Sequence, residues 1–266
     1  MDEQSASDPA PEDLGDPVGR ADAGLAAAMM LSAGGSYNGP VAPSQLLSRG
    51  ARGKPPQAWS IDDMITLYHA PQSRSTRMLW LLEELGEAYS IHPVSISRPM
   101  SGDGAPDPAN PHPDKRVPAI DHDGILVAES LAIVLYLTEA FPGAQLGPVV
   151  GDSQRGAYLT WLAWYAAEFE PALFAGLGGE LNSAPHKMRS YTVAMKRLET
   201  ALAHGPFMLG ERFSAVDFLI SSALAFGRKV FPDDPALDAY IQRCHSRPAA
   251  VRGLALDNAS GLQRAA

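Results

Sequence analysis

Ser73 and Ser75 follow Pro71, where a predicted strand, Met64–His69, gives way to a predicted helix. A serine at the start of a helix is a common N-cap, and this structural role explains Ser73 without any chemistry. At the positive end of a helix the same hydroxyl can instead donate a hydrogen bond to a thiolate, which lowers the pKa of the thiol below its ordinary value of about 8.5. Ser75 can equally be the cap or the donor, so the sequence leaves both roles open.

A second polar pair, Glu129 and Ser130, stands at the start of another predicted helix, Glu129–Phe141. An acid and a hydroxyl both favour a helix start, so the pair has a purely structural interpretation. A helix N-terminus also binds carboxylates, and Glu129 can pair with an ammonium group. The pair therefore suits the zwitterionic end of an amino-acid-like ligand.

The first strand and its helix begin an α/β domain. Residues Met64–His69 alternate apolar and polar positions, and apolar residues recur at helical spacing over Met78–Leu85 up to Gly86, a good stop. The segment Ala88–Ile96 is predicted to be a second strand. Because a helix separates the two strands, a right-handed parallel crossover is expected.

Two short strands and a helix complete this domain. The strands Arg116–Ile120 and Ile125–Val127 are separated by Asp123 and Gly124, a strong hairpin signal, and the helix Glu129–Phe141 follows. The sequence thus predicts βαβ followed by ββα over residues 64–145.

The strand patterns end after residue 145, and only helical patterns follow. They cover Asp152–Leu177, Pro185–His204, Ser214–Val230 and Pro235–Ser246. Each break between them carries Gly or Pro. We expect an all-helical domain over residues 152–250, followed by a tail over residues 251–266. Within it, Ser214 and Asp217 have the spacing of a structural capping box.

The first 63 residues have a different composition from the rest. They contain 33 Ala, Gly, Pro and Ser residues, and their only aromatic residues are Tyr37 and Trp59. This is too little apolar bulk to offset the entropy of ordering, so we expect a disordered extension with at most a weak helix around Ala21–Leu31. A domain beginning at Met64 would lose nothing obvious, which makes this methionine a candidate translation start.

Composition and charge exclude several classes of protein. Of the 266 residues, 45% are hydrophobic and 19% are charged, which are globular values, and the net charge of −9 disfavours nucleic acid as a partner. The single cysteine, Cys244, permits no internal disulfide or cysteine-rich metal site and suits a reducing compartment, the cytoplasm. The apolar stretch Ala23–Ala33 is too short to span a bilayer and lacks the preceding positive charge of an export signal, so no membrane partner is expected.

Taken together, these segments resemble the cytosolic glutathione transferase family over nearly all of residues 64–250. Leu67–Arg77 looks like the family's first strand and the turn with its catalytic serine. Asn110–Ile120 is similar to the segment with its cis-proline, and Asp123–Leu137 to its acidic-residue-plus-serine element. Residues 110–118 are two residues longer than the family's segment and lack its glycine, which puts the contacts to the glycine end of the ligand in question.

The resemblance implies a thioredoxin-like domain followed by a helical bundle, and glutathione as co-substrate. Either Ser73 or Ser75 would stabilise the thiolate, and a cis bond between Val117 and Pro118 would present the Val117 main chain to the peptide-like ligand. The other residues implied to bind glutathione are Glu129 and Ser130 at its γ-glutamyl end, and Lys115, Arg116 and His112 at its glycine carboxylate. Trp161 and Tyr165, in an aromatic series that otherwise forms core, are candidates for an electrophile pocket.

The implied function is a glutathione S-transferase, which adds the glutathione thiolate to a small hydrophobic electrophile. No metal is required, and a homodimer is implied. Two alternatives stay open: a non-catalytic glutathione or small-ligand binding or interaction module, and a glutathione-dependent peroxidase, isomerase or ether-cleaving enzyme. A thiol-exchange enzyme is disfavoured because residues 71–75 contain no cysteine.

Overall fold

The computed structural model of the protein describes residues 64–98 and 101–265, with side chains described as far as residue 259. Residues 1–63 lie outside the described part of the chain. The predictions of a disordered extension, of its weak helix and of a start at Met64 therefore stay predictions.

A four-stranded sheet lies at the centre of the first domain, in the order β2-β1-β3-β4. The strands are β1 (Ile65–His69), β2 (Tyr89–Pro93), β3 (Ala119–His122) and β4 (Ile125–Ala128). Strand β1 pairs in parallel with β2 and antiparallel with β3, and β3 pairs antiparallel with β4. This is the predicted thioredoxin-like βαβ-ββα topology, followed by a helical domain.

Two strand boundaries differ from the prediction by three residues, and the others differ by at most two. Strand β2 ends at Pro93 rather than Ile96, and β3 begins at Ala119 rather than Arg116. Pro118 precedes β3, and a proline has no N–H with which to continue the ladder. The predicted hairpin turn is present, since Asp123 and Gly124 have φ values of 54° and 78°.

Helices α2 (Arg74–Leu85) and α3 (Ser130–Ala140) follow β1 and β4. Helix α2 begins at a capping box in which the Ser73 hydroxyl accepts from a backbone amide and Thr76 Oγ1 accepts from the Ser73 amide at 3.1 Å. It ends at Gly86, whose φ of 74° is the left-handed conformation usual at this position. The predicted stop at Gly86 is therefore confirmed, and of the two candidate caps Ser73 is the one that fills the N-cap position.

The second domain is helical, as predicted. Its helices are α4 (Arg155–Trp164), α5 (Glu170–Leu177), α6 (Pro185–Leu202), α7 (Ala215–Phe226) and α8 (Pro235–His245). A π-helical turn, η3 (Tyr165–Phe169), joins α4 to α5, and short 3₁₀ turns lie at η2 (Pro142–Ala144) and η4 (Arg228–Val230). The capping box of Ser214 and Asp217 opens α7. None of the helices in the described ranges is long and apolar enough to cross a membrane.

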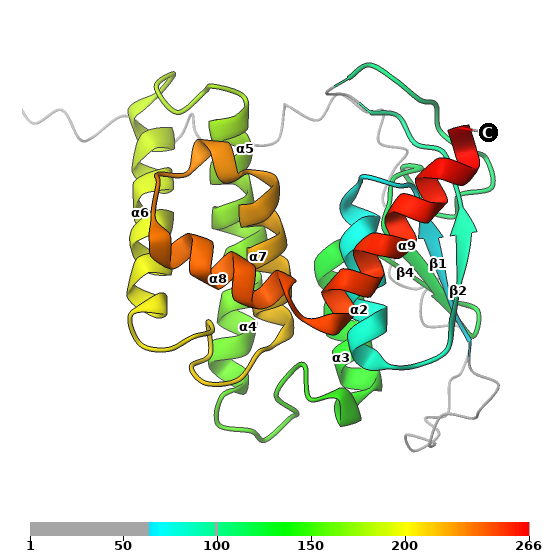
Figure 1. Ribbon diagram of the computed structural model, residues 1–266, viewed down its shortest axis with the longest axis horizontal. Coiled ribbons are helices and arrows are strands. Elements are labelled where there is room, and N and C mark those ends of the chain that lie inside the picture. Colours follow the sequence, from blue (N-terminus) through cyan, green and yellow to red (C-terminus); the bar gives the residue numbers. More distant parts are fainter. Residues whose placement is uncertain (1–63, 99–100, 266) are drawn as a thin grey trace, which may run out of the picture. The chain divides into compact units, whose positions relative to one another are not determined.

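Residues 251–265, expected to be a tail, are part of a further helix, α9 (Pro248–Ala265). Figure 1 shows this helix returning from the helical domain to lie beside α2 in the first domain. The buried residues at the start of α9 are small: they are Ala249, Ala250 and Gly253. The expectation of a tail was wrong because it rested on large apolar residues at helical spacing, and this helix packs through small ones.

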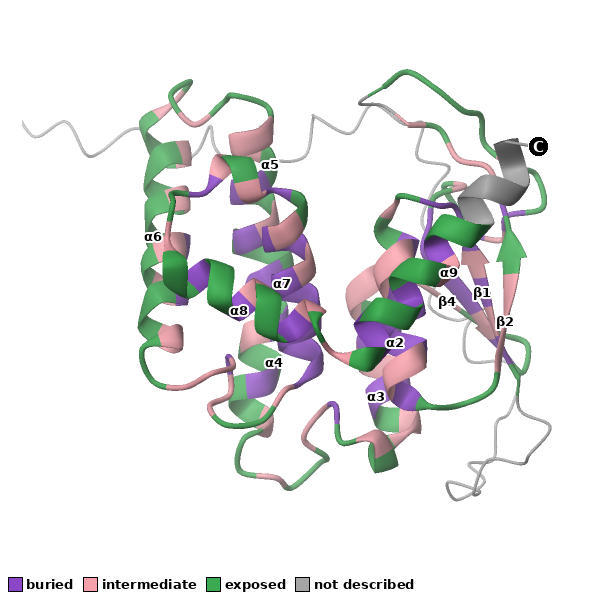
Figure 2. Cartoon of the chain, viewed as in Figure 1, coloured by how far each residue is buried: buried purple, intermediate pink, exposed green. Residues whose placement is uncertain are grey.

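One hydrophobic core joins the two domains. Trp80 of α2 stacks on Phe213 at 6.0 Å between ring centroids and meets Phe218 of α7 edge-on at 5.2 Å. Figure 2 shows buried residues concentrated on α2 and on α7. Helix α2, which carries Ser73 at its start, is thus held between the sheet, α7 and α9.

Candidate functional site

The turn between β1 and α2 brings the two predicted serines together, with 2.8 Å between their hydroxyl oxygens. Ser73 Oγ accepts from the Ser75 amide at 3.1 Å and donates to the Ala70 carbonyl at 2.6 Å. Ser75 is fully buried, whereas Ser73 is half-buried. Ser73 therefore fills the N-cap and is also the hydroxyl of the pair with exposed surface.

Behind Ser75 lie two residues that the sequence did not single out, His69 and Asp257. Ser75 Oγ is 2.9 Å from His69 Nδ1, and His69 Nε2 is 3.3 Å from Asp257 Oδ1, close enough for an ion pair but outside hydrogen-bond geometry. The Asp257 carboxylate also accepts from Thr76 Oγ1 at 2.6 Å and from the Gln72 amide at 3.2 Å. Burial raises the pKa of Asp257, but the hydrogen bonds it accepts from its neighbours outweigh that effect and hold it below its ordinary value.

An arginine also holds the outer side of this turn. Arg98, in the segment after β2, donates to the Pro71 carbonyl at 2.6 Å and to the Gln72 carbonyl at 3.1 Å. Gln72 has a φ of 54°, a left-handed conformation that is uncommon for glutamine. Contacts from Asp257 and Arg98 therefore fix the backbone of the turn from two sides.

The peptide bond between Val117 and Pro118 is cis, as the resemblance implied. Val117 is buried against Ala70 and Val94 in a small apolar cluster of its own. The cluster places the main chain before β3 next to the turn that carries Ser73.

The second predicted pair lies at the start of α3. Glu129 is the N-cap with a φ of 70°, and its carboxylate is 68% exposed. Ser130 Oγ accepts from Arg77 Nη2 at 3.1 Å. The pair is therefore tied to α2, the helix that begins at Ser73.

Arg77 connects this pair to the helical domain. Its guanidinium, 9% exposed, donates to the Tyr165 hydroxyl at 2.5 Å and lies 3.5 Å from Glu170 Oε1. Tyr165 in turn donates to Glu170 Oε1 at 2.8 Å. Arg77 thus supports the α2–α3 junction and links it to η3 and α5.

The cationic residues before Val117 differ in what they contact. Lys115 Nζ donates to the carbonyls of Asn110 at 2.7 Å and Pro108 at 3.3 Å, so it braces its own loop. Arg116 is 62% exposed and bonds to Asp114 at 2.8 Å and to Glu129 at 3.2 Å. His112 is buried, accepts from the Asp114 amide, and has a pKa lowered mainly by burial.

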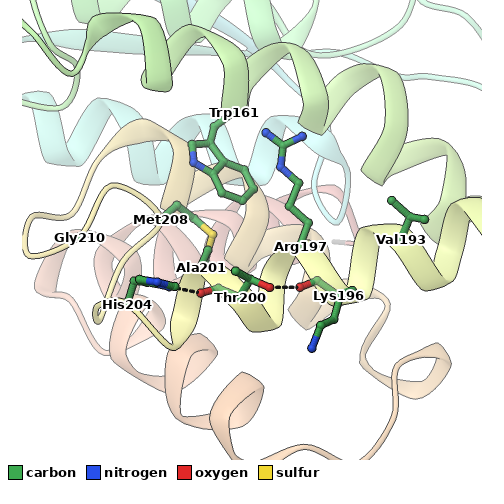
Figure 3. A pocket seen from close by; sticks show the side chains of 9 residues that line it. All are labelled: Trp161, Val193, Lys196, Arg197, Thr200, Ala201, His204, Met208 and Gly210. Atoms are coloured by element: carbon green, nitrogen blue, oxygen red, sulfur yellow. Dashed lines mark hydrogen bonds between the residues drawn. The ribbon is translucent and has the colours of Figure 1, made fainter.

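The two candidates for an electrophile pocket occupy different places. Tyr165 is 2% exposed, its hydroxyl is engaged by Arg77 and Glu170, and burial raises its pKa to about 12. Trp161 lines an open pocket of about 510 Å³ between α4 and α6, where Arg197 lies 4.6 Å from its ring centroid (Figure 3). Figure 1 shows α6 on the side of the helical domain away from α2. The structure therefore brings neither side chain to the surface beside Ser73.

A different aromatic residue lies beside the start of α2. The Arg74 guanidinium is 5.1 Å from the ring centroid of Phe174 in α5, and Phe174 lies 6.4 Å from Phe226. Phe174 is 38% exposed and Phe226 is 62% exposed. Arg74 follows Ser73 directly, so this exposed aromatic surface adjoins the Ser73 turn.

Within residues 64–98 and 101–265, no three His, Cys, Asp or Glu side chains are grouped as metal ligands would be. The titratable groups near Ser73 contact one another or the backbone. The chemistry that this arrangement offers is hydrogen bonding to an anion at the start of α2.

Comparison with known proteins identifies glutathione S-transferases and an isomerase with similar sequences. Residues 64–139 match the family model described as the glutathione S-transferase N-terminal domain. The chain is 27% identical over 174 residues to glutathione S-transferase 3 of Schizosaccharomyces pombe, covering 58% of this chain and 70% of that protein. It is 28% identical over 160 residues to maleylacetoacetate isomerase of Rattus norvegicus, covering 58% of this chain and 73% of that protein.

Solved structures agree with these sequence matches. A sphingomonad glutathione S-transferase complexed with glutathione has a TM-score of 0.61 and 25% identity. The match covers 73% of this chain and 98% of that one. The chain has the fold of the glutathione S-transferases, and its residues 64–139 match the family's N-terminal domain. In this chain, the Ser73 turn, the cis-proline segment and the start of α3 adjoin one another.

Four residues at this site escaped the sequence analysis: His69, Arg98, Glu170 and Asp257. In the sequence, His69 is the last residue of a predicted strand. Nothing in the sequence distinguishes Arg98 and Glu170 from ordinary surface charges. A buried face of small residues at four-residue spacing, ending in an acid, is the signal that would have identified Asp257.

Proposed function

We propose that the protein is a glutathione transferase that ionises the thiol of bound glutathione and adds the thiolate to a small hydrophobic electrophile. The observation that carries this proposal is the half-buried Ser73 hydroxyl at the start of α2, beside the Val117–Pro118 segment. The match of residues 64–139 to the glutathione S-transferase N-terminal domain and the similarity to the glutathione-bound sphingomonad enzyme support it.

Ser73, rather than Ser75, is proposed as the hydroxyl that touches the sulfur. Ser75 is 0% exposed and enclosed by His69, Ala70 and Ser73, so a ligand atom has no path to it without rearrangement. Ser73 donates to Ala70 in the structure and would turn its proton to a thiolate. A charge-assisted hydrogen bond at a helix N-terminus stabilises the anion over the thiol.

The rest of the tripeptide is assigned to the neighbouring segments. We place the γ-glutamyl carboxylate at Ser130 and the start of α3, and its ammonium at Glu129, which is exposed and carries the matching charge. The Val117 main chain is proposed to pair with the cysteinyl backbone. Arg116 is the proposed partner of the glycine carboxylate, because its side chain is 62% exposed and already bonds to carboxylates, at Asp114 and Glu129. Lys115 bonds to two carbonyls of its own loop.

We place the electrophile against Phe174 and Phe226 rather than at Trp161 or Tyr165, because this aromatic surface adjoins Ser73 through Arg74. In the reaction the sulfur forms a bond to an electrophilic carbon. The leaving group departs with its electron pair, or, in an addition, the electron pair of the attacked bond takes up a proton. Holding both reactants side by side supplies the remaining acceleration.

We also infer a cytoplasmic homodimer. The edge strand β4 exposes two apolar residues, Ile125 at 47% and Leu126 at 43%, and closed symmetric dimers commonly bury such surfaces. Light scattering on the purified protein tests this, since a monomer at all concentrations would contradict it.

The mechanism is tested by ultraviolet thiolate absorbance of bound glutathione against pH, together with turnover on a panel of electrophiles. Ser73→Ala should raise the pKa of the bound thiol and lower turnover near neutral pH, with glutathione affinity little changed. The panel includes aryl halides, epoxides, aryl ethers and hydroperoxides. It also includes a dienoic acid, because one relative is named an isomerase. If bound glutathione titrates like free glutathione in the wild-type protein, the transferase proposal fails and a binding module is favoured.

A further inference from the structure

A line of four polar side chains runs from α9 through the first strand to the Ser73 turn. It passes from Asp257 to His69 at 3.3 Å, from His69 to Ser75 at 2.9 Å, and from Ser75 to Ser73 at 2.8 Å. His69 and Ser75 are 0% exposed and Asp257 is 2% exposed, so the three inner members are shielded from water. Ser73 alone in this line has exposed surface.

We propose that His69, held by Asp257, accepts the glutathione thiol proton through the hydroxyls of Ser75 and Ser73. Ser73 touches the ligand, and His69 acts through it. Asp257 is a positioning residue that orients the imidazole and balances its charge. This inference rests on the proposed function, and it adds the destination of the proton and a role for the last helix.

The direction of the relay depends on where two protons lie. Asp257 faces Nε2 at 3.3 Å without hydrogen-bond geometry, and an ionised carboxylate has no proton to give. We therefore assign the proton of the neutral imidazole to Nε2, which leaves a lone pair at Nδ1. The oxygen of Ser75 accepts from the Ala70 amide at 3.1 Å, and its one proton lies within reach of both the Ala70 carbonyl at 3.1 Å and His69 Nδ1 at 2.9 Å. The relay uses the arrangement in which Ser75 donates to Nδ1. The remaining acceptor position of the Ser75 oxygen faces Ser73 Oγ, 2.8 Å away.

The proton count balances along this line. The glutathione S–H gives its proton to Ser73 Oγ, Ser73 passes its own proton to Ser75 Oγ, and Ser75 passes its own to His69 Nδ1. Both serines end as neutral hydroxyls, the sulfur ends as a thiolate, and His69 ends as an imidazolium beside Asp257. No other co-reactant is needed, since imidazole changes its protonation state near neutral pH.

Asp257 is the counterion of His69 in this line. Asp257 comes from α9, and Thr76 and the Gln72 amide hold its carboxylate. From the segment after β2, Arg98 bonds to the carbonyls of Pro71 and Gln72 on the outer side of the turn. From the segment after β2, the Val94 amide donates to the His69 carbonyl at 2.9 Å. The Asp257 carboxylate, 3.3 Å from His69 Nε2, is the charged group that faces the imidazole from α9.

The deciding measurement is the number of protons released to solvent for each thiolate formed. Calorimetric titration with glutathione in buffers of different ionisation enthalpy gives the protons released, and ultraviolet absorbance gives the thiolate. In the wild-type protein most of the proton stays on His69, so we expect far fewer than one proton per thiolate. His69→Gln removes the acceptor, so release should rise to about one proton per thiolate.

Two further variants keep the test independent of folding. Asp257→Asn retains a hydrogen-bonding side chain and should raise the proton release, because the imidazolium loses its counterion. His122→Gln is the matched control: His122 is equally buried, on β3 opposite Ile65, at the far end of β1 from His69. It should leave the proton count at the wild-type value. Nitrogen NMR of the wild-type complex should show the His69 ring becoming an imidazolium.

The outcomes separate this inference from the proposed function. Thiolate formation with about one proton released by the wild-type protein would overturn the relay and leave the transferase proposal intact. A neutral His69 ring in a complex that contains thiolate would do the same. A wild-type complex without thiolate would overturn both.

Discussion

Gly253 of α9 lies directly against the backbone of Trp80 in α2. A β-carbon at position 253 would stand 2.7 Å from the Trp80 nitrogen and 2.8 Å from its α-carbon. The two helices therefore cross at a place where only glycine fits. One turn further along α9, Asp257 reaches Thr76 and the amide of Gln72 beside the Ser73 turn.

Gly253→Ala should destabilise the protein by about 1–3 kcal/mol, because the atoms it would meet belong to a helix backbone and cannot move aside. Urea unfolding measures the change. Gly156→Ala is the matched control, since a β-carbon there meets nothing within 4 Å in α4 and should stabilise the protein by about 0.4–1 kcal/mol. Equal stability of the two variants would contradict the close crossing.

Arg77→Ala should lower the free energy of unfolding by about 2–3 kcal/mol, since it removes charge-assisted hydrogen bonds to Ser130 and Tyr165 in a nearly buried position. Arg74→Ala removes another cation paired with the same Glu170, but Arg74 is 48% exposed and should cost less than about 1 kcal/mol. Thermal unfolding of the two variants side by side tests the difference. A cost at Arg74 equal to that at Arg77 would show that burial is not what matters.

Glu129→Ala should weaken glutathione binding by about tenfold to a hundredfold, the effect of losing one charge-assisted contact to the ligand ammonium. Asp114→Ala is the control, because Asp114 also pairs with Arg116 and is similarly exposed but is assigned no ligand contact. Calorimetry with glutathione gives both affinities. Unchanged affinity in Glu129→Ala would remove the assignment of the γ-glutamyl end.

The stability supplied by Asp257 should depend on pH. Its folded-state pKa lies below the ordinary value of 3.8, so its ionised form stabilises the fold above that pH. This stabilisation is lost as the pH falls through the folded-state pKa. The difference in unfolding free energy between wild type and Asp257→Asn should therefore be full at neutral pH and shrink below about pH 4.

Urea unfolding at a series of pH values measures that difference. Asp233→Asn serves as a control, because the Asp233 side chain is fully exposed and its replacement should give a small, nearly constant difference. A difference for Asp257→Asn that grows in acid would have the wrong sign for a carboxylate stabilised in its ionised form.

The sequence predicted the elements whose apolar residues recur at regular spacing. Helix α2 was located by its leucines and by Gly86, and the β3–β4 hairpin by Asp123 and Gly124. The predicted helix Asp152–Leu177 missed the π-helical turn at Tyr165–Phe169, because such a turn inside a helix has no residue-type signal of its own. Helix α9 was missed because its contact with α2 depends on small size rather than hydrophobicity.

The candidate site was predictable only where it is local in sequence. Ser73 and Ser75 share one turn, and Glu129 and Ser130 share one helix start, so spacing alone identified them. The pairing of His69 with Asp257 depends on how α9 packs on α2. Whether Tyr165 is buried or faces a ligand depends on which face of its helix meets Arg77. No short-range pattern encodes either contact.

The contact between the Gln72 amide and Asp257 spans 185 positions of the chain and joins its first strand region to its last helix. During synthesis, β1 and α2 leave the ribosome long before α9 exists, and domains fold in the order in which they emerge. A nascent first domain therefore holds Ser73 without the aspartate behind it. The contacts of Asp257 with Gln72 and Thr76 form only after α9 has been translated. A polypeptide halted earlier would contain the first domain, but its Ser73 turn would lack these contacts.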